Sequence, residues 1–312
     1  MDRVALSVVS VNISEKKGIV KSPVDFIDLD SRGISGDAHA GNWHRQVSLL
    51  GEESMKRFSD RAGREISYGE FAENITTRGL ELSETSPLDR LVSDTVELEI
   101  TQIGKKCHGS TCAILKEVGD CVMPKEGIFA RVVRGGRLKQ GDSLEYRPRG
   151  FRFLVVTLSD RASRGEYEDK SGPAISRILH EHFDFRRRGI VVENHVIPDD
   201  EHKLRDILDR SMKGDYDFII TTGSTGVGNR DICPDVVKPM LSREIPGIME
   251  LIRVKYGADK PNALLSRGVA GLMGSSFIYT LPGSVKAVNE YMGEILKTME
   301  HLAYMLHGID SH

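Results

Sequence analysis

From Phe151 onward the sequence alternates buried strands with amphipathic helices, and this alternation constrains the fold more than any other feature. The run "FRFLVVTLSD" (151–160) has the near-continuous hydrophobicity of a strand covered on both faces. A helical pattern, "SGPAISRILHEHF", follows it, and the alternation continues through "GIVVENHVIPDD", "YDFIITTG" and "SFIYTLPG" to a long amphipathic helix from about Val285 to Leu306. We therefore expect an α/β domain of three layers with a mostly parallel sheet.

The first half of the chain has a different rhythm. Short apolar runs such as "VALSVVSVNI", "FIDLD", "VELEIT" and "GIFARVV" are separated by Gly, Asp and Ser, which predicts a β-rich barrel or sandwich. Two helices are expected, in "GEESMKRFSDRAG" and in "SYGEFAENI". Pro148 and Gly150 interrupt regular structure, so the predicted domains are residues 1–149 and 150–312.

Composition narrows the function classes. The chain of 312 residues is 39% hydrophobic and 29% charged, as in a soluble globular protein of two cores. The net charge of −3 argues against nucleic-acid binding, and no apolar run reaches the roughly 20 residues of a membrane span. The start has no signal-peptide pattern, and four cysteines are too few for a disulfide scaffold, so we expect a cytoplasmic protein without a membrane partner.

Ligands of open α/β sheets bind outside the carboxyl ends of the strands. Four such ends carry polar or glycine-rich sequences: "LSD" with Ser159 and Asp160, "IPDD" with Asp199 and Asp200, "TTGSTG" from Thr221 to Gly226, and "LPGS" with Pro282 and Gly283. Because these ends share one edge of the sheet, the sequence predicts a binding site there.

The stretch "TTGSTGVGNRDICPD" has the composition of a phosphate-binding loop. Gly223, Gly226 and Gly228 allow backbone N–H groups to point inward, and a helix is expected to begin near Pro234. Arg230 adds a formal positive charge. The alternative is a flexible connection with a solvated arginine.

A carboxylate beside a phosphate requires a cation between them. Asp231 lies in the proposed loop, and magnesium is normally held by one or two carboxylates together with substrate phosphates. Asp199 is the candidate for the second carboxylate. Either Asp199 or Asp200 is also expected to cap the following helix, which leaves one residue to cap and one to bind.

The second domain resembles the molybdopterin adenylyltransferases, the family of bacterial MogA and MoaB, plant Cnx G domains and the gephyrin G domain. The resemblance rests on "VVTLSDRASRGEYEDKSGP", "VIPDDEHKL", "TTGSTGVGNRDICPDV", "REIPGIMELIR" and "ALLSRGVAGLMGSSFIYTLPGS", which occur in family order. It implies that molybdopterin attacks the α-phosphate of ATP with magnesium present, giving adenylyl-molybdopterin and pyrophosphate.

The resemblance also implies residue roles. Asp231 and Asp199 would be the catalytic carboxylates and the magnesium ligands. The nucleotide and the pterin would contact Ser159, Asp160, Gly223, Ser224, Thr225, Gly226, Arg230, Ser266, Arg267, Ser275, Pro282 and Gly283, with Ser266, Arg267 and Ser275 reaching toward the pterin or its phosphate. The chain departs from the family pattern at Ser224, usually glycine, and at Ser284-Val285, usually Asn-Pro.

Two further expectations follow from this resemblance. The protein would be a homotrimer through its second domain, and its partners would include other proteins of molybdenum-cofactor biosynthesis. The alternative to catalysis is a molybdopterin-binding carrier or scaffold, because the gephyrin G domain shows that the family can take structural duties.

The first domain resembles MOSC domains, β-barrels associated with handling of the molybdenum cofactor, often sulfur transfer or cofactor binding. The resemblance rests on "SRGISGDAHAGNWHRQVSLL", "FAENI", "KKCHGSTCAIL" and "GDCVMPKEGIFARVVRGG". It implies that this domain binds or sulfur-modifies a cofactor intermediate.

The cysteines of the first domain allow three interpretations. Cys107, His108, Cys112 and Cys121 could bind zinc, although no Cys-x2-Cys pair is present. The three cysteines could instead be inert buried thiols, or they could include a reactive thiolate, with Cys107 or Cys112 favoured. His39 and His44 could bind an anion, or they could simply be hydrogen-bonded in a loop.

Overall fold

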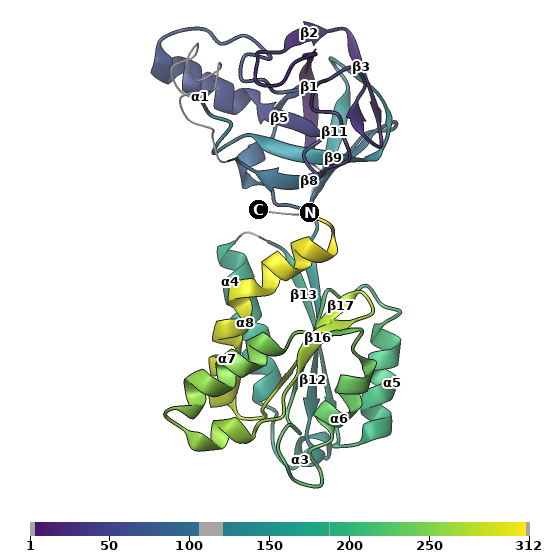
Figure 1. The fold of residues 1–312 in the computed structure, drawn as a ribbon, viewed down its shortest axis with the longest axis vertical. Helices are drawn as coiled ribbons and strands as arrows, with labels where there is room; N and C mark the ends of the chain where they lie inside the picture. Colours follow the sequence, from purple (N-terminus) through teal and green to yellow (C-terminus); the bar gives the residue numbers. More distant parts are fainter. Residues whose placement is uncertain (1–3, 106–120, 187, 310–312) are drawn as a thin grey trace. The chain divides into compact units, whose positions relative to one another are not determined.

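The computed structural model describes residues 4–105, 121–186 and 188–309. Contacts between Cα atoms divide the chain into two compact units (Figure 1). The first unit runs to Arg149 and includes the segment from His307 on, and the second unit is Gly150–Leu306.

The first unit is a closed barrel of seven strands. Closure follows from the pairing of the last strand, β11, with both β7 and β1. The barrel strands are β1 (Val4–Ile13), β5 (Val47–Gly51), β6 (Ile75–Arg78), β7 (Arg90–Val92), β8 (Glu97–Ile103), β9 (Ile128–Arg134) and β11 (Ser143–Arg147). The predicted β-barrel is thus confirmed, and its interior is filled by aliphatic side chains from these strands.

Smaller elements surround the barrel. They are β2 (Ser22–Val24), which pairs with β1, the three-stranded sheet of β3 (Phe26–Asp30), β4 (Gly33–Ile34) and β10 (Gly136–Lys139), the helix α1 (Glu52–Ala62) and the 3₁₀ turn η1 (Leu82–Glu84). The predicted helix in "GEESMKRFSDRAG" is therefore confirmed as α1.

The helix predicted in "SYGEFAENI" is wrong. Gly69 and Ala72 have positive φ angles of 85° and 62°, and the segment turns before entering β6. The Glu73 carboxylate accepts hydrogen bonds from the N–H groups of Gly69 (2.5 Å) and Phe71 (3.1 Å). A side chain that takes up local backbone donors stabilises a turn at the expense of a helix.

The second unit contains a six-stranded sheet in the order β13-β12-β14-β17-β16-β15. Its strands are β12 (Phe151–Leu158), β13 (Ile190–Ile197), β14 (Phe218–Thr222), β15 (Arg243–Glu244), β16 (Ala270–Met273) and β17 (Ser276–Leu281). Its helices are α3 (Asp160–Ser163), α4 (Ser171–Phe185), α5 (Glu201–Ser211), α6 (Cys233–Val237), α7 (Pro246–Gly257) and α8 (Val285–Leu306), with 3₁₀ turns η3 (Lys238–Met240) and η4 (Pro261–Leu265).

The sheet is mixed, so the expectation of a mostly parallel sheet needs correction. β13, β12, β14 and β17 pair in parallel, but β16 is antiparallel to β17 and β15 is antiparallel to β16. The physical reason is the tight turn at Gly274 and Ser275, because strands joined by two residues must run in opposite directions. The sequence pattern did not indicate a strand at β16.

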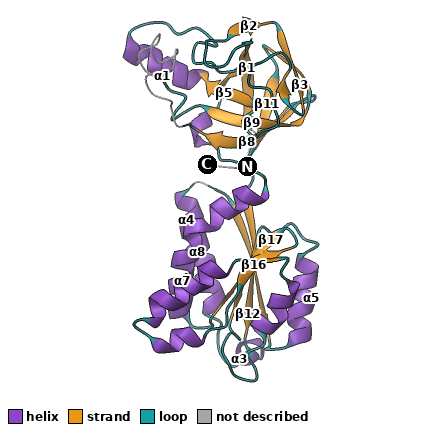
Figure 2. Ribbon diagram, in the orientation of Figure 1, coloured by secondary structure: helices purple, strands orange, loops and turns teal. Residues whose placement is uncertain are grey.

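Helices cover both faces of this sheet, with α4, α7 and α8 on one side and α5 and α6 on the other (Figure 2). Leu154 and Val156 of β12 pack in one core cluster with Leu204 of α5, whereas Phe153 packs against Phe183 of α4. Burial on both faces explains why β12 has an almost uninterrupted apolar sequence. In the described part of the chain, no helix has the length and apolar character needed to cross a membrane.

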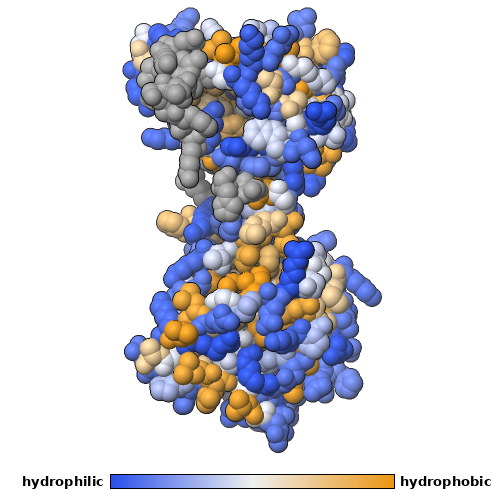
Figure 3. All heavy atoms as spheres, in the orientation of Figure 1, coloured by the Kyte–Doolittle hydropathy of each residue, from blue (hydrophilic) through white to orange (hydrophobic). Residues whose placement is uncertain are grey.

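Exposed apolar side chains gather on α7 and the adjoining η4. Leu251, Val254, Leu264 and Leu265 are 54%, 70%, 54% and 56% exposed, and we call these four residues the apolar patch. Figure 3 shows apolar side chains in the lower left part of the view, where Figure 1 places α7.

Candidate active site

Two adjoining cavities lie where β12, β13, β14 and β17 end. The first has a volume of about 350 Å³ and is lined by three carboxylates, Asp160, Asp199 and Asp231, so we call it the acidic cavity. The second has a volume of about 480 Å³ and contains Lys260 and Lys286, so we call it the lysine cavity. Ser224, Asp231 and Gly283 line both cavities.

Asp160 and Asp199 link the ends of neighbouring strands in the acidic cavity. Each carboxylate accepts the backbone N–H of the other residue at 3.2 Å. The second oxygen of Asp160 forms an ion pair with Arg230 at 2.5 Å, although the Arg230 side chain is 77% exposed. Asp160 and Asp199 therefore contact each other, and Asp160 contacts Arg230 of the glycine loop, before any ligand binds.

The structure distinguishes Asp199 from Asp200. Asp200 is the N-cap of α5, where its side chain accepts the N–H of Lys203 at 2.9 Å. Asp199 lines the acidic cavity and makes no cap. Of the two aspartates, Asp200 therefore caps the helix and Asp199 faces the site.

The glycine loop approaches other parts of the backbone closely. Gly223 has φ = +98°, and a Cβ atom there would lie 2.3 Å from the carbonyl oxygen of Leu158. A Cβ atom at Gly226 would lie 2.7 Å from the Asp231 carboxylate. Ser224 tolerates φ = +58° while its hydroxyl donates to the Arg230 carbonyl at 2.6 Å. The loop is thus cross-linked internally, which argues against a flexible connection.

Asp231 is held by its own loop. Its carboxylate accepts the N–H of Gly228 at 2.7 Å. α6, which follows, is only five residues long, with Pro234 in its first turn. The loop therefore depends more on its own hydrogen bonds than on the short helix that follows it.

Arg267 lies behind the loop. Its Nε donates to the carbonyl of Gly226 at 2.7 Å, and another nitrogen donates to the carbonyl of Asp231. Its Nη1 pairs with Asp235 at 2.8 Å, and its backbone N–H donates to Thr225. Arg267 lines neither cavity, so the structure gives it a bracing position where the resemblance implied contact with the pterin or its phosphate.

Other predicted residues take separate positions. Ser159 caps α3 and its hydroxyl lies 3.1 Å from the Tyr167 hydroxyl in the acidic cavity. Ser266 and Pro282 line the lysine cavity. Ser275 needs correction, because it lies in the β16–β17 turn at the amino end of β17, whereas the cavities lie beyond the carboxyl end of that strand.

Four titratable residues of the lysine cavity were not identified from the sequence. They are Lys260, which precedes η4, and Lys286, Glu290 and Tyr291 of α8. For the three residues on α8 only proximity to "LPGS" was a signal, because α8 is a regular amphipathic helix and its charged residues resemble an ordinary solvated face. Lys260 had no such signal in the sequence.

The acidic cavity has donors that suit magnesium. Asp199 and Asp231 supply hard carboxylate oxygens, the ligand type that magnesium prefers. Within the described ranges, no group of three or more His, Cys, Asp or Glu side chains is arranged to hold a metal. Cys233, close to the loop, is fully buried, and burial raises the pKa of its thiol to about 12, which makes it a poor ligand or nucleophile.

In the barrel unit, His39 belongs to a buried ionic cluster. Asp37 forms an ion pair with Lys21 at 2.5 Å between two fully buried side chains, and His39 Nδ1 lies 3.3 Å from Lys21 and 3.4 Å from Asp37. Burial lowers the pKa of Lys21. The backbone carbonyl of His44 accepts the Thr101 hydroxyl at 2.6 Å.

Cys107 and Cys112, the favoured thiols of the first domain, and His108 lie outside the described residues. Cys121 is partly buried and forms no disulfide within the part of the chain that the structure describes.

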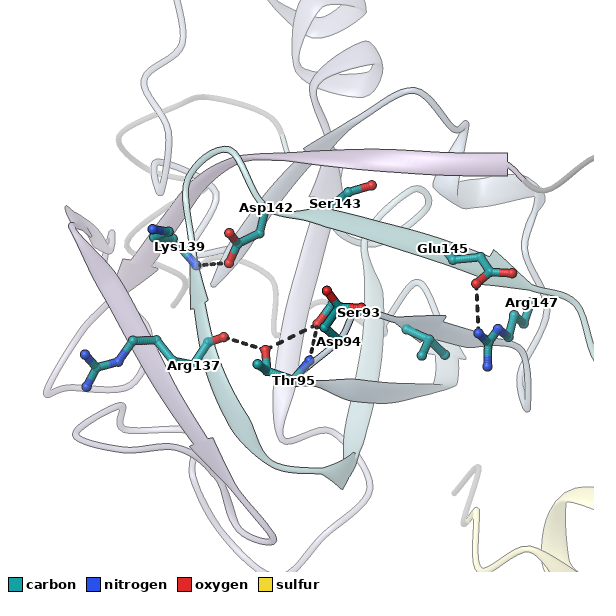
Figure 4. A pocket seen from close by; sticks show the side chains of 10 residues that line it. Ser93, Asp94, Thr95, Arg137, Lys139, Asp142, Ser143, Glu145 and Arg147 are labelled. Atoms are coloured by element: carbon teal, nitrogen blue, oxygen red, sulfur yellow. Dashed lines mark hydrogen bonds and ion pairs between the residues drawn. The ribbon is translucent and has the colours of Figure 1, made fainter.

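A cavity of about 580 Å³ in the barrel unit is not lined by His39 or His44 (Figure 4). Glu145 of this cavity pairs with Arg147 at 2.8 Å, and the Asp142 carboxylate accepts the backbone N–H of Lys139 at 2.9 Å. This cavity therefore does not gather the residues predicted for the first domain.

Both units match known protein families. Residues 154–301 match the profile described as "Probable molybdopterin binding domain", and residues 36–145 match the MOSC domain profile. A molybdopterin adenylyltransferase of Helicobacter pylori is 33% identical over 159 residues, or 49% of this chain and 86% of that protein. Gephyrin of Dictyostelium discoideum is 36% identical over 153 residues, or 47% of this chain and 21% of that protein.

Among solved structures, a molybdopterin biosynthesis protein from Mycobacterium abscessus is 34% identical and covers 51% of this chain and 97% of its own, with a TM-score of 0.46. The chain spans about a fifth of the gephyrin but most of the Helicobacter protein. Through residues 154–301 the chain therefore belongs to the molybdopterin adenylyltransferase family of molybdenum-cofactor biosynthesis proteins, and it carries a MOSC domain in its first half.

Proposed function

We propose that the second domain transfers AMP from magnesium-ATP to molybdopterin. The observation that carries the proposal is the pair of adjoining cavities that share Ser224, Asp231 and Gly283. A transfer between two substrates requires two neighbouring binding sites, and holding both substrates in place supplies much of the rate enhancement.

In this reaction a phosphate oxygen of molybdopterin forms a bond to the α-phosphorus of ATP, and the bond to pyrophosphate breaks. Magnesium held by Asp199 and Asp231 would neutralise phosphate charge when bound. Gly223 lines the acidic cavity and Gly226 the lysine cavity, where glycine backbone without a side chain would let phosphates approach closely, and Arg230 offers a cation at the edge of the acidic cavity. The chain itself contributes positioning and charge.

The two aspartates provide the test, with a matched control next to one of them. Asp199→Ala and Asp231→Ala should each lower AMP transfer by about 10²-fold or more, because each removes a carboxylate of the acidic cavity. Asp200→Ala should keep the activity and lower the free energy of unfolding by about 1 kcal/mol, because it removes a helix cap.

Pyrophosphate release and adenylyl-molybdopterin formation are the measurements. Undiminished turnover in both Asp199→Ala and Asp231→Ala would refute the assignment. Saturable molybdopterin binding by the wild-type protein without pyrophosphate release would instead indicate a carrier or scaffold.

For the first domain we propose binding or sulfur modification of a cofactor intermediate, on the basis of its MOSC family match. Mass spectrometry after incubation with a cysteine desulfurase and cysteine tests the sulfur-transfer form of this proposal. A gain of one sulfur atom at Cys107 or Cys112 is the expected result, and an unchanged mass at every cysteine of this domain would end that idea.

We further propose a cytoplasmic homotrimer that associates through the second domain and works with other molybdenum-cofactor biosynthesis proteins. The support for association is the apolar patch on α7 and η4, since exposed patches of apolar side chains commonly mark protein interfaces. Leu265 of this patch also lines the lysine cavity, so assembly would take place beside the site.

A further inference from the structure

Charge is distributed unevenly between the two cavities. The acidic cavity contains three carboxylates, from Asp160, Asp199 and Asp231, against the arginines Arg161 and Arg230. In the lysine cavity the residues not shared with its neighbour carry two ammonium groups, from Lys260 and Lys286, and one carboxylate, from Glu290. With the shared Asp231 included, the formal charge is −1 in the acidic cavity and zero in the lysine cavity, so a phosphate without a bound metal is repelled less in the lysine cavity.

One lysine of this cavity is held by a residue of α8. Lys260 forms an ion pair with Glu290, and this hydrogen bond is the main cause that raises the pKa of Lys260. Lys286 lines the same cavity. A bound anion would relieve the repulsion between the two ammonium groups.

The cavity is built on a rigid element. Lys286 and Glu290 are four residues apart on the 22-residue helix α8, so both project from the same face. Tyr291, only 3% exposed, closes the cavity one turn along the helix. These side chains are presented by a long helix, which suits a preformed binding site.

We propose that Lys260 and Lys286 form a phosphate-binding subsite for the phosphate monoester of the pterin substrate. This inference rests on the proposed function, because it assigns one half of the site to one of the two substrates. The lysine cavity shares Ser224 and Asp231 with the acidic cavity, so a phosphate held by the lysines lies next to the space assigned to magnesium-ATP. The triphosphate of ATP has the same phosphate chemistry and is the other candidate occupant of this subsite.

Binding of inorganic phosphate tests the subsite without any turnover. In isothermal titration calorimetry of the full chain without magnesium, Lys260→Met and Lys286→Met should each weaken phosphate binding about tenfold. Glu290→Gln should strengthen it, because this change releases Lys260 from its carboxylate. Lys297→Met is the matched control, since Lys297 also lies on α8 but pairs with Glu294 and lines neither cavity. Unchanged phosphate binding in both Lys→Met variants would overturn the subsite.

Steady-state kinetics distinguish the two sources of phosphate. The Lys→Met variants should raise the KM for molybdopterin about tenfold and leave the KM for ATP unchanged, and Lys286→Arg should restore most of the loss. A rise in the KM for ATP alone would overturn the assignment to the pterin. Lysine-dependent phosphate binding by a wild-type protein that transfers no AMP would refute the proposed function while leaving the phosphate subsite in place.

Discussion

At the residue scale, Glu73 of the barrel is a carboxyl group with no exposure to solvent. Burial raises its pKa to about 7 from an ordinary value of 4.5, even though the carboxylate accepts hydrogen bonds from Gly69, Phe71 and Thr76. The same side chain causes the turn that replaces the helix predicted in this segment.

The stability of the barrel should therefore depend on the state of Glu73. Between pH 4.5 and 7 the folded protein keeps the proton that the unfolded chain releases, so the free energy of unfolding should fall as the pH rises, by up to about 1.4 kcal/mol per pH unit. Glu73→Gln should remove this contribution. Urea unfolding followed by the fluorescence of Trp43, the single tryptophan, reports on this unit. An identical pH slope in the Gln variant would contradict the assignment.

At the scale of elements, the glycine loop between β14 and α6 owes its shape to Arg267. Three loop carbonyls, from Thr225, Gly226 and Asp231, accept hydrogen bonds from the backbone and side chain of this residue. Arg267 comes from the segment before β16, so the hairpin that makes the sheet mixed also supports the loop. We regard Arg267 as a positioning residue.

Removal of this brace should loosen the loop without unfolding the domain. Arg267→Ala should speed amide hydrogen exchange in residues 224–232 and lower AMP transfer roughly tenfold to hundredfold, because small displacements at a transfer site are costly. Arg267→Lys should recover only part of the loop's protection from exchange and only part of the AMP transfer, since lysine cannot donate in several directions from a planar group. Arg177→Ala is a control, because Arg177 pairs with Glu181 on α4 and lines neither cavity. Unaltered loop exchange in Arg267→Ala would contradict the bracing role.

At the scale of the whole molecule, the second unit exposes the apolar patch while its sheet is covered by helices on both faces. Leu251 and Val254 lie three residues apart on α7, so they project from one side of that helix. Exposure of this kind is costly for a single chain and is relieved by association.

The wild-type protein should elute as three chains in size-exclusion chromatography with light scattering. Val254→Glu should shift it toward single chains, because a charge would enter the apolar patch, whereas Val133→Glu, a comparable change on the exposed side of β9 in the barrel, should not. A single-chain mass for the wild-type protein would contradict the proposed trimer.

The sequence predicted the elements whose patterns are local and strong. The long helix begins at Val285 and ends at Leu306 as expected, and the first strand of the second unit runs from Phe151 as expected. Burial on two faces leaves a continuous apolar run in a strand, and burial of one stripe leaves a clear hydrophobic period in a helix. Convergence of the four strand ends also followed from topology alone. The short antiparallel strand β16 has no such signature and was missed.

Some distinctions depended on contacts between distant residues. Adjacent in sequence and identical in chemistry, Asp199 and Asp200 differ only because one meets the Asp160 backbone and the other the start of α5. Contacts between distant residues also place Arg267 behind the glycine loop, and they bring Lys260 and Lys286 into one cavity. Composition and periodicity by themselves indicated a β-rich first domain, an α/β second domain and the edge of the sheet where the site lies, because hydrophobic spacing and turn residues act locally. Only the tertiary structure decided which side chains face that edge, because side-chain direction is set by the long-range packing of the elements that carry them.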